Sequence, residues 1–183
     1  MPATPRWSPA VRNVHARHLL APAESLAGRL DHLGGPDDEL WPAPVWWPLR
    51  LTGAAGPGPA PGASGGHGPI RYAVEEYQPG QRVRFRFTPA VGLDGYHEFT
   101  LEPLPPADDG TPRCRLSHVI RARLVRRRTL VLWPLLIRPL HDALLEDLLD
   151  RAEQVATGRV ARPARWSPWV RLCRALLRRQ GLL

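Results

Sequence analysis

Three histidines could carry out acid–base chemistry in this chain, because their sequence neighbours predict that all three face one interior. His97 and His118 alternate with apolar residues in two extended segments, and His141 lies on the apolar stripe of a later helical segment. An imidazole titrates near neutral pH, so these side chains are candidates for general acid–base catalysis or for hydrogen bonding to a ligand carbonyl. The alternative is three buried histidines, each satisfied by a neighbouring hydroxyl or carbonyl.

A metal site is the weakest interpretation of these histidines. Zinc needs nitrogen ligands that converge to about 2.0–2.1 Å from the ion, and no carboxylate obviously joins the three rings. We therefore predict no metal and no cofactor. His67 belongs to the segment Gly65-Gly66-His67-Gly68, which lacks the Lys-Ser/Thr ending of a phosphate-binding loop. We interpret His67 as incidental to a turn, with a position at a cavity mouth as the alternative.

Three carboxylates at four-residue spacing, Asp142, Glu146 and Asp150, resemble a set of paired catalytic acids. The same spacing is typical of the charged outer face of a helix, and Arg138 stands four residues before Asp142. We therefore predict a solvated face stabilised by salt bridges rather than a catalytic pair.

Two predicted hairpins position the first two histidines. Alternating runs flank a turn at Pro79-Gly80, and a second pair of runs, 96–102 and 113–125, flanks a loop at 103–112. In the first hairpin the expected pairs are Val74 with Phe85, Tyr72 with Phe87, Arg84 with Glu75, and one mismatch, Val83 with Glu76. In the second they are Phe99 with Leu116, Leu101 with Cys114, and His97 with His118.

The remaining elements follow from periodicity and from helix start and stop signals. We expect a first strand at 14–20 with Val14, Ala16, His18 and Leu20 inside, a helix between Pro22 and Gly34-Gly35, a helical turn at 37–41, a strand or extended cover at 45–51, a loop at 53–68, and a long helix at 132–157 whose start is set by Pro134 and Pro139. The apolar stripe of this helix contains Ile137, His141, Leu144, Leu145, Leu148, Ala152 and Val155. Trp41, Trp46 and Trp47 could cap a cavity or pack in the core.

The composition indicates one domain with extensions. The chain has 183 residues, and all of its 25 basic residues are arginine. Two distant cysteines, Cys114 and Cys173, suit reduced thiols, and we expect a cytoplasmic protein without a signal peptide. The longest apolar run, 130–137, is too short to span a bilayer.

The positive charge belongs to the C-terminal tail. Residues 1–158 hold 18 arginines and 17 acids, a net charge of +1, whereas residues 159–183 hold seven arginines and no acid. This distribution argues against nucleic acid as a partner of the whole domain.

The tail itself predicts an amphipathic helix that Ser167 caps and Pro168 begins. The expected apolar face contains Trp169, Leu172, Cys173, Leu176 and Leu177, and the basic face contains Arg171, Arg174 and Arg178. The helix could lie at an anionic membrane surface, dock on an acidic protein partner, or pack on its own domain with its arginines solvated.

Four segments resemble bacterial SRPBCC proteins, the START-like, helix-grip superfamily of polyketide cyclases and lipid-transfer domains. They are Gly-Gly-His-Gly-Pro-Ile-Arg-Tyr (65–72), Tyr-x-Pro-Gly-x-x-Val-x-Phe-x-Phe (77–87), Gly-Tyr-His-Glu-Phe (95–99) and Arg-Pro-Leu-His-Asp-Ala-Leu-Leu-Glu-Asp-Leu-Leu-Asp (138–150). The resemblance implies an α+β fold in which a curved antiparallel sheet wraps around a long C-terminal helix. It carries over no catalytic residue.

These observations predict a disordered segment at 1–13, a ligand-binding domain at 14–157, and an arginine-rich linker and amphipathic helix at 158–183. The expected function is binding of a hydrophobic small molecule (a lipid, a polyketide or an aromatic metabolite) in an internal cavity. The alternative is a polyketide cyclase- or hydratase-like enzyme that uses one cavity histidine, His97, His118 or His141. The predicted cavity residues are Tyr72, Val74, Phe85, Phe87, His97, Phe99, His118, His141 and Leu145.

Overall fold

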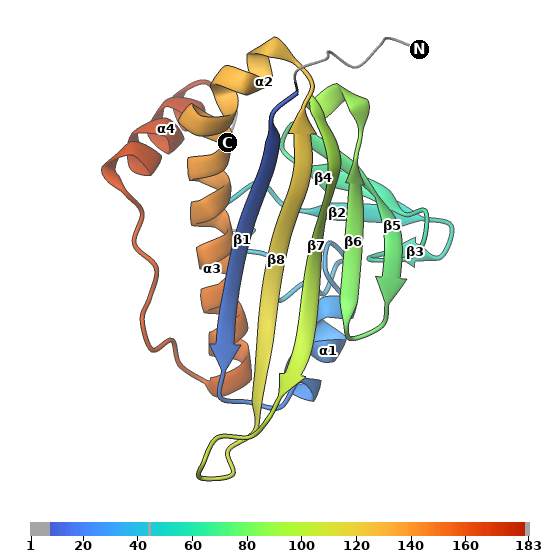
Figure 1. Ribbon diagram of the computed structural model, residues 1–183, viewed down its shortest axis with the longest axis vertical. Helices are drawn as coiled ribbons and strands as arrows, with labels where there is room; N and C mark the ends of the chain where they lie inside the picture. The colour runs from blue at the N-terminus through green and yellow to red at the C-terminus, as the bar shows by residue number, and fades with distance from the viewer. Residues whose placement is uncertain (1–7, 44, 182–183) are drawn as a thin grey trace.

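The chain folds as a curved antiparallel sheet packed against a long C-terminal helix, as Figure 1 shows. The computed structural model describes residues 8–43 and 45–181. The strands are β1 (Ala10–Leu19), β2 (Arg50–Gly53), β3 (Gly56–Pro57), β4 (Ser64–His67), β5 (Ile70–Gln78), β6 (Arg82–Phe87), β7 (Leu93–Leu104) and β8 (Arg113–Leu124). They pair in the spatial order β1-β8-β7-β6-β5-β4-β2-β3.

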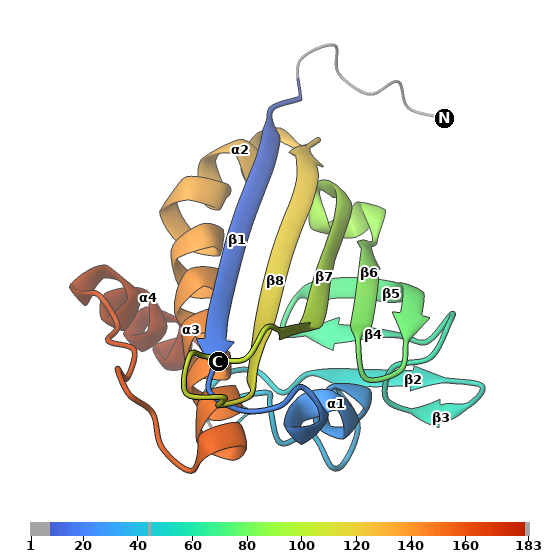
Figure 2. The same ribbon diagram turned by 60° about the horizontal axis from the view of Figure 1, so that its bottom comes forward.

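The helices lie along one side of this sheet and at its end, which Figure 2 shows from a second direction. They are α1 (Glu24–Asp31), α2 (Arg127–Leu132), α3 (Arg138–Thr157) and α4 (Pro168–Arg179), with a π-helical turn (Trp133–Ile137) between α2 and α3 and a 3₁₀ turn at Pro89–Val91. This architecture confirms the predicted α+β helix-grip class.

The first strand differs from its prediction in both start and orientation. It begins at Ala10, so residues 10–13 of the predicted disordered segment are ordered, and residues 1–7 lie outside the described part. Its inner face carries Asn13 and Leu19, which are buried, whereas Val14 and Leu20 are exposed. The polar face turns inward because the acidic face of α3 lies opposite it.

The acidic residues of α3 are therefore not the solvated face that we predicted. Arg17 donates hydrogen bonds to Asp150, Glu153 (2.9 Å) and Glu146 (3.1 Å), and only 17% of the Arg17 side chain is exposed. The predicted partner Arg138 is more distant, with 3.6 Å between its Nε atom and Asp142. These half-buried ion pairs join the edge strand β1 to the helix.

The first hairpin confirms Val74 opposite Phe85 and Tyr72 opposite Phe87. The pairing near the turn is corrected by a bulge between Val74 and Glu76. Beyond it, Arg84 pairs with Glu76 and Val83 with Tyr77. The extra residue removes the predicted mismatch, since an apolar side chain now faces an apolar one.

The second hairpin is shifted by two residues from its predicted register. Phe99 pairs with His118, Leu101 with Leu116, Pro103 with Cys114, and His97 with Ile120. A shift by an even number leaves every side chain on its predicted face. Both histidines therefore still point to the interior, but they are diagonal neighbours rather than direct partners.

The predicted loop at 53–68 contains two short strands, β3 and β4. A Cβ atom on Gly65 would lie 1.8 Å from the Arg50 carbonyl oxygen, and one on Gly66 would lie 1.9 Å from that of Ile70. Only glycine allows the backbones of β2 and β5 to approach β4 this closely. The predicted helical turn at 37–41 is instead an irregular turn, which the Asp38 carboxylate stabilises by accepting hydrogen bonds from the amides of Gly34, Leu40 and Trp41.

The C-terminal helical segment begins at Arg127, five residues before its predicted start. Pro134 lies in the π-helical turn, and Pro139 lies in the first turn of α3. The chain continues as a helix through both prolines, because the π-turn interrupts the regular α-helical ladder at Pro134 and Pro139 occupies a first-turn position that needs no N–H donor.

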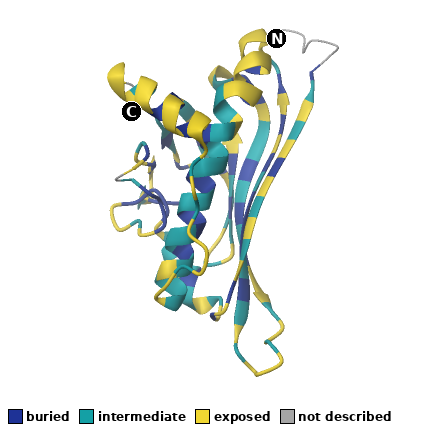
Figure 3. Ribbon diagram, turned by 90° about the vertical axis from the view of Figure 1, so that its left-hand side faces the viewer, coloured by how far each residue is buried: buried dark blue, intermediate teal, exposed yellow. Residues whose placement is uncertain are grey.

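The terminal helix α4 packs on its own domain. Ser167 caps it by accepting a hydrogen bond from the Val170 amide (3.2 Å), as predicted. Val170 and Cys173 are buried, and so is Arg174, at 2% exposure, which corrects its predicted place on a solvated basic face. Figure 3 shows exposed residues along the outer side of this helix.

Candidate functional site

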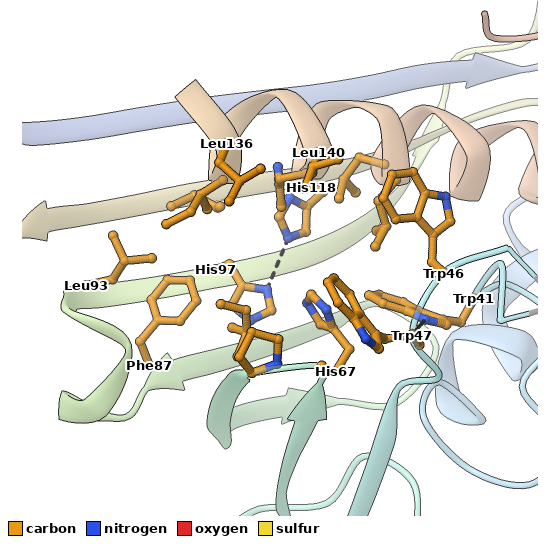
Figure 4. A pocket seen from close by; sticks show the side chains of 18 of the residues that line it. Trp41, Trp46, Trp47, His67, Phe87, Leu93, His97, His118, Leu136 and Leu140 are labelled. Atoms are coloured by element: carbon orange, nitrogen blue, oxygen red, sulfur yellow. Dashed lines mark hydrogen bonds between the residues drawn. The ribbon is translucent and has the colours of Figure 1, made fainter. Parts of the chain in front are cut away.

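A cavity of about 520 Å³ lies between the inner face of the sheet and the helices. Figure 4 shows its wall: Phe87, His97 and His118 come from the sheet, Leu136 and Leu140 from the helical side, and the three tryptophans at 41, 46 and 47 close one end. Among its lining residues Pro69 and Gly181 are exposed, so the cavity opens between the β4–β5 turn and the end of α4.

The wall of the cavity is apolar and carries no formal charge. None of the described lining residues is Asp, Glu or Arg, and the imidazoles of His67, His97, His118 and His141 are its main polar groups. Two of the indole nitrogens are already occupied, since Trp41 donates to the Trp47 carbonyl (2.7 Å) and Trp46 donates to Asp147 (2.7 Å). These rings therefore present apolar faces to the cavity.

Residues outside the cavity fix the Trp46 side of this wall. The Arg174 guanidinium lies between two indoles, 4.2 Å from the Trp46 ring and 4.3 Å from the Trp166 ring. Asp147 accepts hydrogen bonds from both indoles, and Arg174 also donates to the Val45 carbonyl. The C-terminal helix α4 therefore supports the cavity as well as contributing Leu177 to its lining.

Two of the cavity histidines form a bonded pair. The Nδ1 atom of His97 lies 3.1 Å from the Nε2 atom of His118, and both side chains are buried, at 7% and 2% exposure. Their outer nitrogens, Nε2 of His97 and Nδ1 of His118, are buried without a hydrogen-bond partner in the described structure. One ring must donate and the other accept in the shared bond, so the outer nitrogens always comprise one donor and one acceptor.

These imidazoles are held in the neutral form. Burial lowers the pKa of His97 and His118, and repulsion from His141 lowers both further. Burial also lowers the pKa of His67, to about 3. The pair is therefore uncharged at neutral pH.

The third predicted histidine links the cavity to the ion pairs at β1. The His141 ring is 5.0 Å from that of His118 and 5.9 Å from that of His15. His15 bonds with Asp142 (3.0 Å) and Glu146 (2.8 Å); burial opposes its protonation, but these bonds outweigh burial and raise its pKa. His15, His141 and Asp142 offer ligand atoms within 4.8 Å of one another, so they are the described residues that could hold a cation.

The structure brings most of the predicted cavity residues together. Six of them line the cavity: Phe87, His97, Phe99, His118, His141 and Leu145. Tyr72, Val74 and Phe85 lie behind the wall in the packed core, each at 3% exposure or less. His67, which we interpreted as incidental, also lines the cavity, 4.9 Å from the Trp41 ring.

Sequence reasoning found His141 and Leu145 on α3 but missed the rest of the helical side of the cavity. Trp133, Leu136, Ile137 and Leu140 come from the π-helical turn and the start of α3, and Leu177 comes from α4. The apolar run at 130–137 was the available signal for this wall. A helical run without polar residues has more apolar side chains than one buried face needs, so some of them can line a cavity.

Solved structures with the same fold are only distantly similar in sequence. Truncated norcoclaurine synthase from Thalictrum flavum aligns with a TM-score of 0.57 and 11% identity, over 82% of this chain and 95% of that one. The same enzyme in complex with dopamine and hydroxybenzaldehyde gives a TM-score of 0.52 at 11% identity, over 77% and 85%. XoxI from Bacillus cereus gives 0.50 at 10% identity, over 79% and 94%. No protein-family model matches the sequence, and no curated protein matches it.

The chain thus has the helix-grip fold that its sequence motifs indicated. Identities this low establish the fold and leave function to the site. Among residues 8–43 and 45–181, no helix combines the length and the apolar composition that crossing a bilayer requires.

Proposed function

We propose that this protein binds an uncharged, largely apolar small molecule in the cavity between sheet and helices. The observation that carries the proposal is the cavity of about 520 Å³ whose described lining contains no ionised side chain. Typical sites for drug-sized ligands are concave, predominantly apolar and equipped with few polar groups, and their volumes are about 300–1,000 Å³. A lipid, a polyketide or an aromatic metabolite fits this description.

The polar groups of the cavity favour a ligand with two separate hydrogen-bonding groups, one for each histidine of the pair. His97 and His118 hold one free donor and one free acceptor in an apolar surrounding, where unpaired polar groups are costly. A ligand with a hydrogen-bond donor at one end of the pair and an acceptor at the other would satisfy both, since the two outer nitrogens lie on opposite sides of rings whose centroids are 5.3 Å apart. In the aligned norcoclaurine synthase complex, the bound molecules are dopamine and hydroxybenzaldehyde, which are aromatic and hydroxylated.

The same histidine pair favours a second candidate function, a cyclase- or hydratase-like proton transfer. One outer nitrogen would take a proton from the substrate, the shared proton would cross the 3.1 Å contact, and the other outer nitrogen would return a proton to another substrate atom. The pair ends with as many protons as it began with, in the opposite tautomer.

Native mass spectrometry of the protein purified from its own host tests the binding function. We expect a co-purifying apolar molecule, and we expect it to be lost from Leu140→Trp, which places an indole inside the cavity, and kept by Leu20→Trp on the exposed surface. No bound molecule in the wild type, or the same molecule on both variants, would contradict the proposal. Turnover of the recovered molecule that disappears in His118→Ala, while binding persists, would establish the enzyme.

A further inference from the structure

The described hydrophobic surface of this protein is concentrated in one place. Ten large apolar side chains are exposed, and seven of them belong to α2, the π-helical turn and α4: Leu130, Val131, Leu132, Leu135, Trp169, Leu172 and Leu176. Figure 3 shows both helices with exposed residues at the same end of the molecule. The indole nitrogen of Trp169 donates to the Leu135 carbonyl (2.7 Å), so α4 and the π-turn form one continuous surface.

Exposed arginines surround these apolar side chains. Arg126, Arg127 and Arg128 begin α2, and Arg171, Arg178 and Arg179 lie on α4. The described segments 127–137 and 168–179 contain no Asp or Glu. This surface, the α2–α4 face, therefore combines protruding apolar groups with a purely positive rim.

We propose that the α2–α4 face docks on an anionic lipid surface. A helix bearing Trp and Leu on one side and arginines beside them lies in a membrane interface, with the apolar groups among the acyl chains and the guanidinium groups at the phosphates. A second copy of this chain is a poor occupant, because a two-fold dimer would place these arginines against their own copies. Lipid headgroups supply both the negative charge and the apolar layer that the face lacks.

The position of this face gives docking a consequence for the cavity. Leu136 and Leu177 line the cavity and are direct sequence neighbours of the exposed Leu135 and Leu176. The helical wall of the cavity would therefore rest on the membrane, and an apolar ligand could pass between the two without crossing water. This consequence rests on the proposed binding function, whereas docking itself does not.

Co-sedimentation with vesicles tests the docking, with the full chain and vesicles of phosphatidylcholine alone or with 30% phosphatidylglycerol. We expect binding to the anionic vesicles that weakens as salt shortens the Debye length. Leu132→Ser/Leu176→Ser should abolish most of it, and Arg178→Gln/Arg179→Gln should weaken it by about fivefold for each arginine. The matched controls, Val14→Ser/Leu20→Ser and Arg159→Gln/Arg162→Gln, change exposed residues elsewhere and should bind like the wild type.

Three results would overturn the proposal. They are no sedimentation of the wild type with anionic vesicles at low salt, equal losses in the α2–α4 face variants and the controls, or equal binding to neutral and anionic vesicles. Circular dichroism and thermal melting of each variant show that it is folded. Because every substituted side chain is exposed, we expect melting temperatures near that of the wild type. Retention of a cavity ligand by the variants that no longer sediment separates docking from ligand binding.

Discussion

The Nδ1 atom of His97 and the Nε2 atom of His118 lie 3.1 Å apart inside an otherwise apolar cavity wall. Neighbouring strands place the two rings diagonally, and Tyr72, Phe85 and Phe87 pack around His97 at ring distances of 4.6–4.9 Å. A neutral imidazole pair in this setting has a fixed pattern of one free donor and one free acceptor.

The stability effects of substituting the two histidines should be strongly coupled. His97→Phe or His118→Leu alone leaves the remaining imidazole without its bond, and we expect each to lower the free energy of unfolding by about 1–3 kcal/mol. The double variant removes both polar groups and should be more stable than the sum of the single effects predicts. Urea unfolding of the four proteins measures this coupling, and additive losses would show that the 3.1 Å contact contributes nothing.

The cavity histidines should make the protein sensitive to acid. His67, His97, His118 and His141 have lowered pKa values in the folded protein, so below about pH 6.5 the unfolded chain takes up protons that the folded chain does not. Stability should therefore fall as the pH falls from 6.5, by up to about 1.4 kcal/mol per pH unit for each histidine. His118→Leu should have a smaller slope between pH 6.5 and 5 in urea unfolding; an unchanged slope would contradict the lowered pKa of His118.

The orientation of β1 shows where sequence reasoning fails. Alternation predicted strands and their faces correctly wherever one face meets the apolar core, as in β5 to β8. It gave the wrong face for β1, because His15 and Arg17 are inward to meet carboxylates on a helix more than 120 residues away. A pattern of residue types cannot show that a distant acidic face will compensate buried cations.

The register of the second hairpin and the lining of the cavity were predicted only in part, because neither follows from the alternation of residue types alone. The even shift in the second hairpin kept His97 and His118 inside but changed their partners, because loop length decides register and polarity decides only the face. The part of the helical wall that precedes His141 was missed because Pro134 indicated a helix start, whereas a π-turn carries the helix through it.

Arg174 should stabilise the fold far more than an exposed arginine of the same helix. It lies between Trp46 and Trp166 at 2% exposure, and a desolvated cation over an indole contributes about 2 kcal/mol or more. Arg174→Ala should lower the free energy of unfolding by at least this amount, and Arg178→Ala should change it by less than about 0.5 kcal/mol. Equal effects in denaturant titrations would mean that α4 does not hold the Trp46 wall.

The close approach of β4 to β2 should make Gly65 intolerant of any side chain. Gly65→Ala places a Cβ atom 1.8 Å from the Arg50 carbonyl oxygen, so the strands must separate, at a cost of about 1–3 kcal/mol or more. Gly28→Ala is the matched control, because its Cβ atom meets nothing within 4 Å in helix α1 and should stabilise by about 0.5–1 kcal/mol. Thermal melting should show a lower melting temperature for Gly65→Ala and a higher one for Gly28→Ala than for the wild type. Similar melting temperatures of the two variants would contradict the arrangement of β4.

The most direct test of the central claim is equilibrium binding of an uncharged apolar fluorescent probe, 1-N-phenylnaphthylamine, to the purified protein. The cavity predicts saturable binding of one probe per chain to the wild type and to Leu20→Trp, and binding at least about tenfold weaker to a folded Leu140→Trp, in which the indole occupies the cavity. Binding that does not saturate, or equal affinities of Leu140→Trp and the wild type, would contradict a ligand cavity between the sheet and the helices.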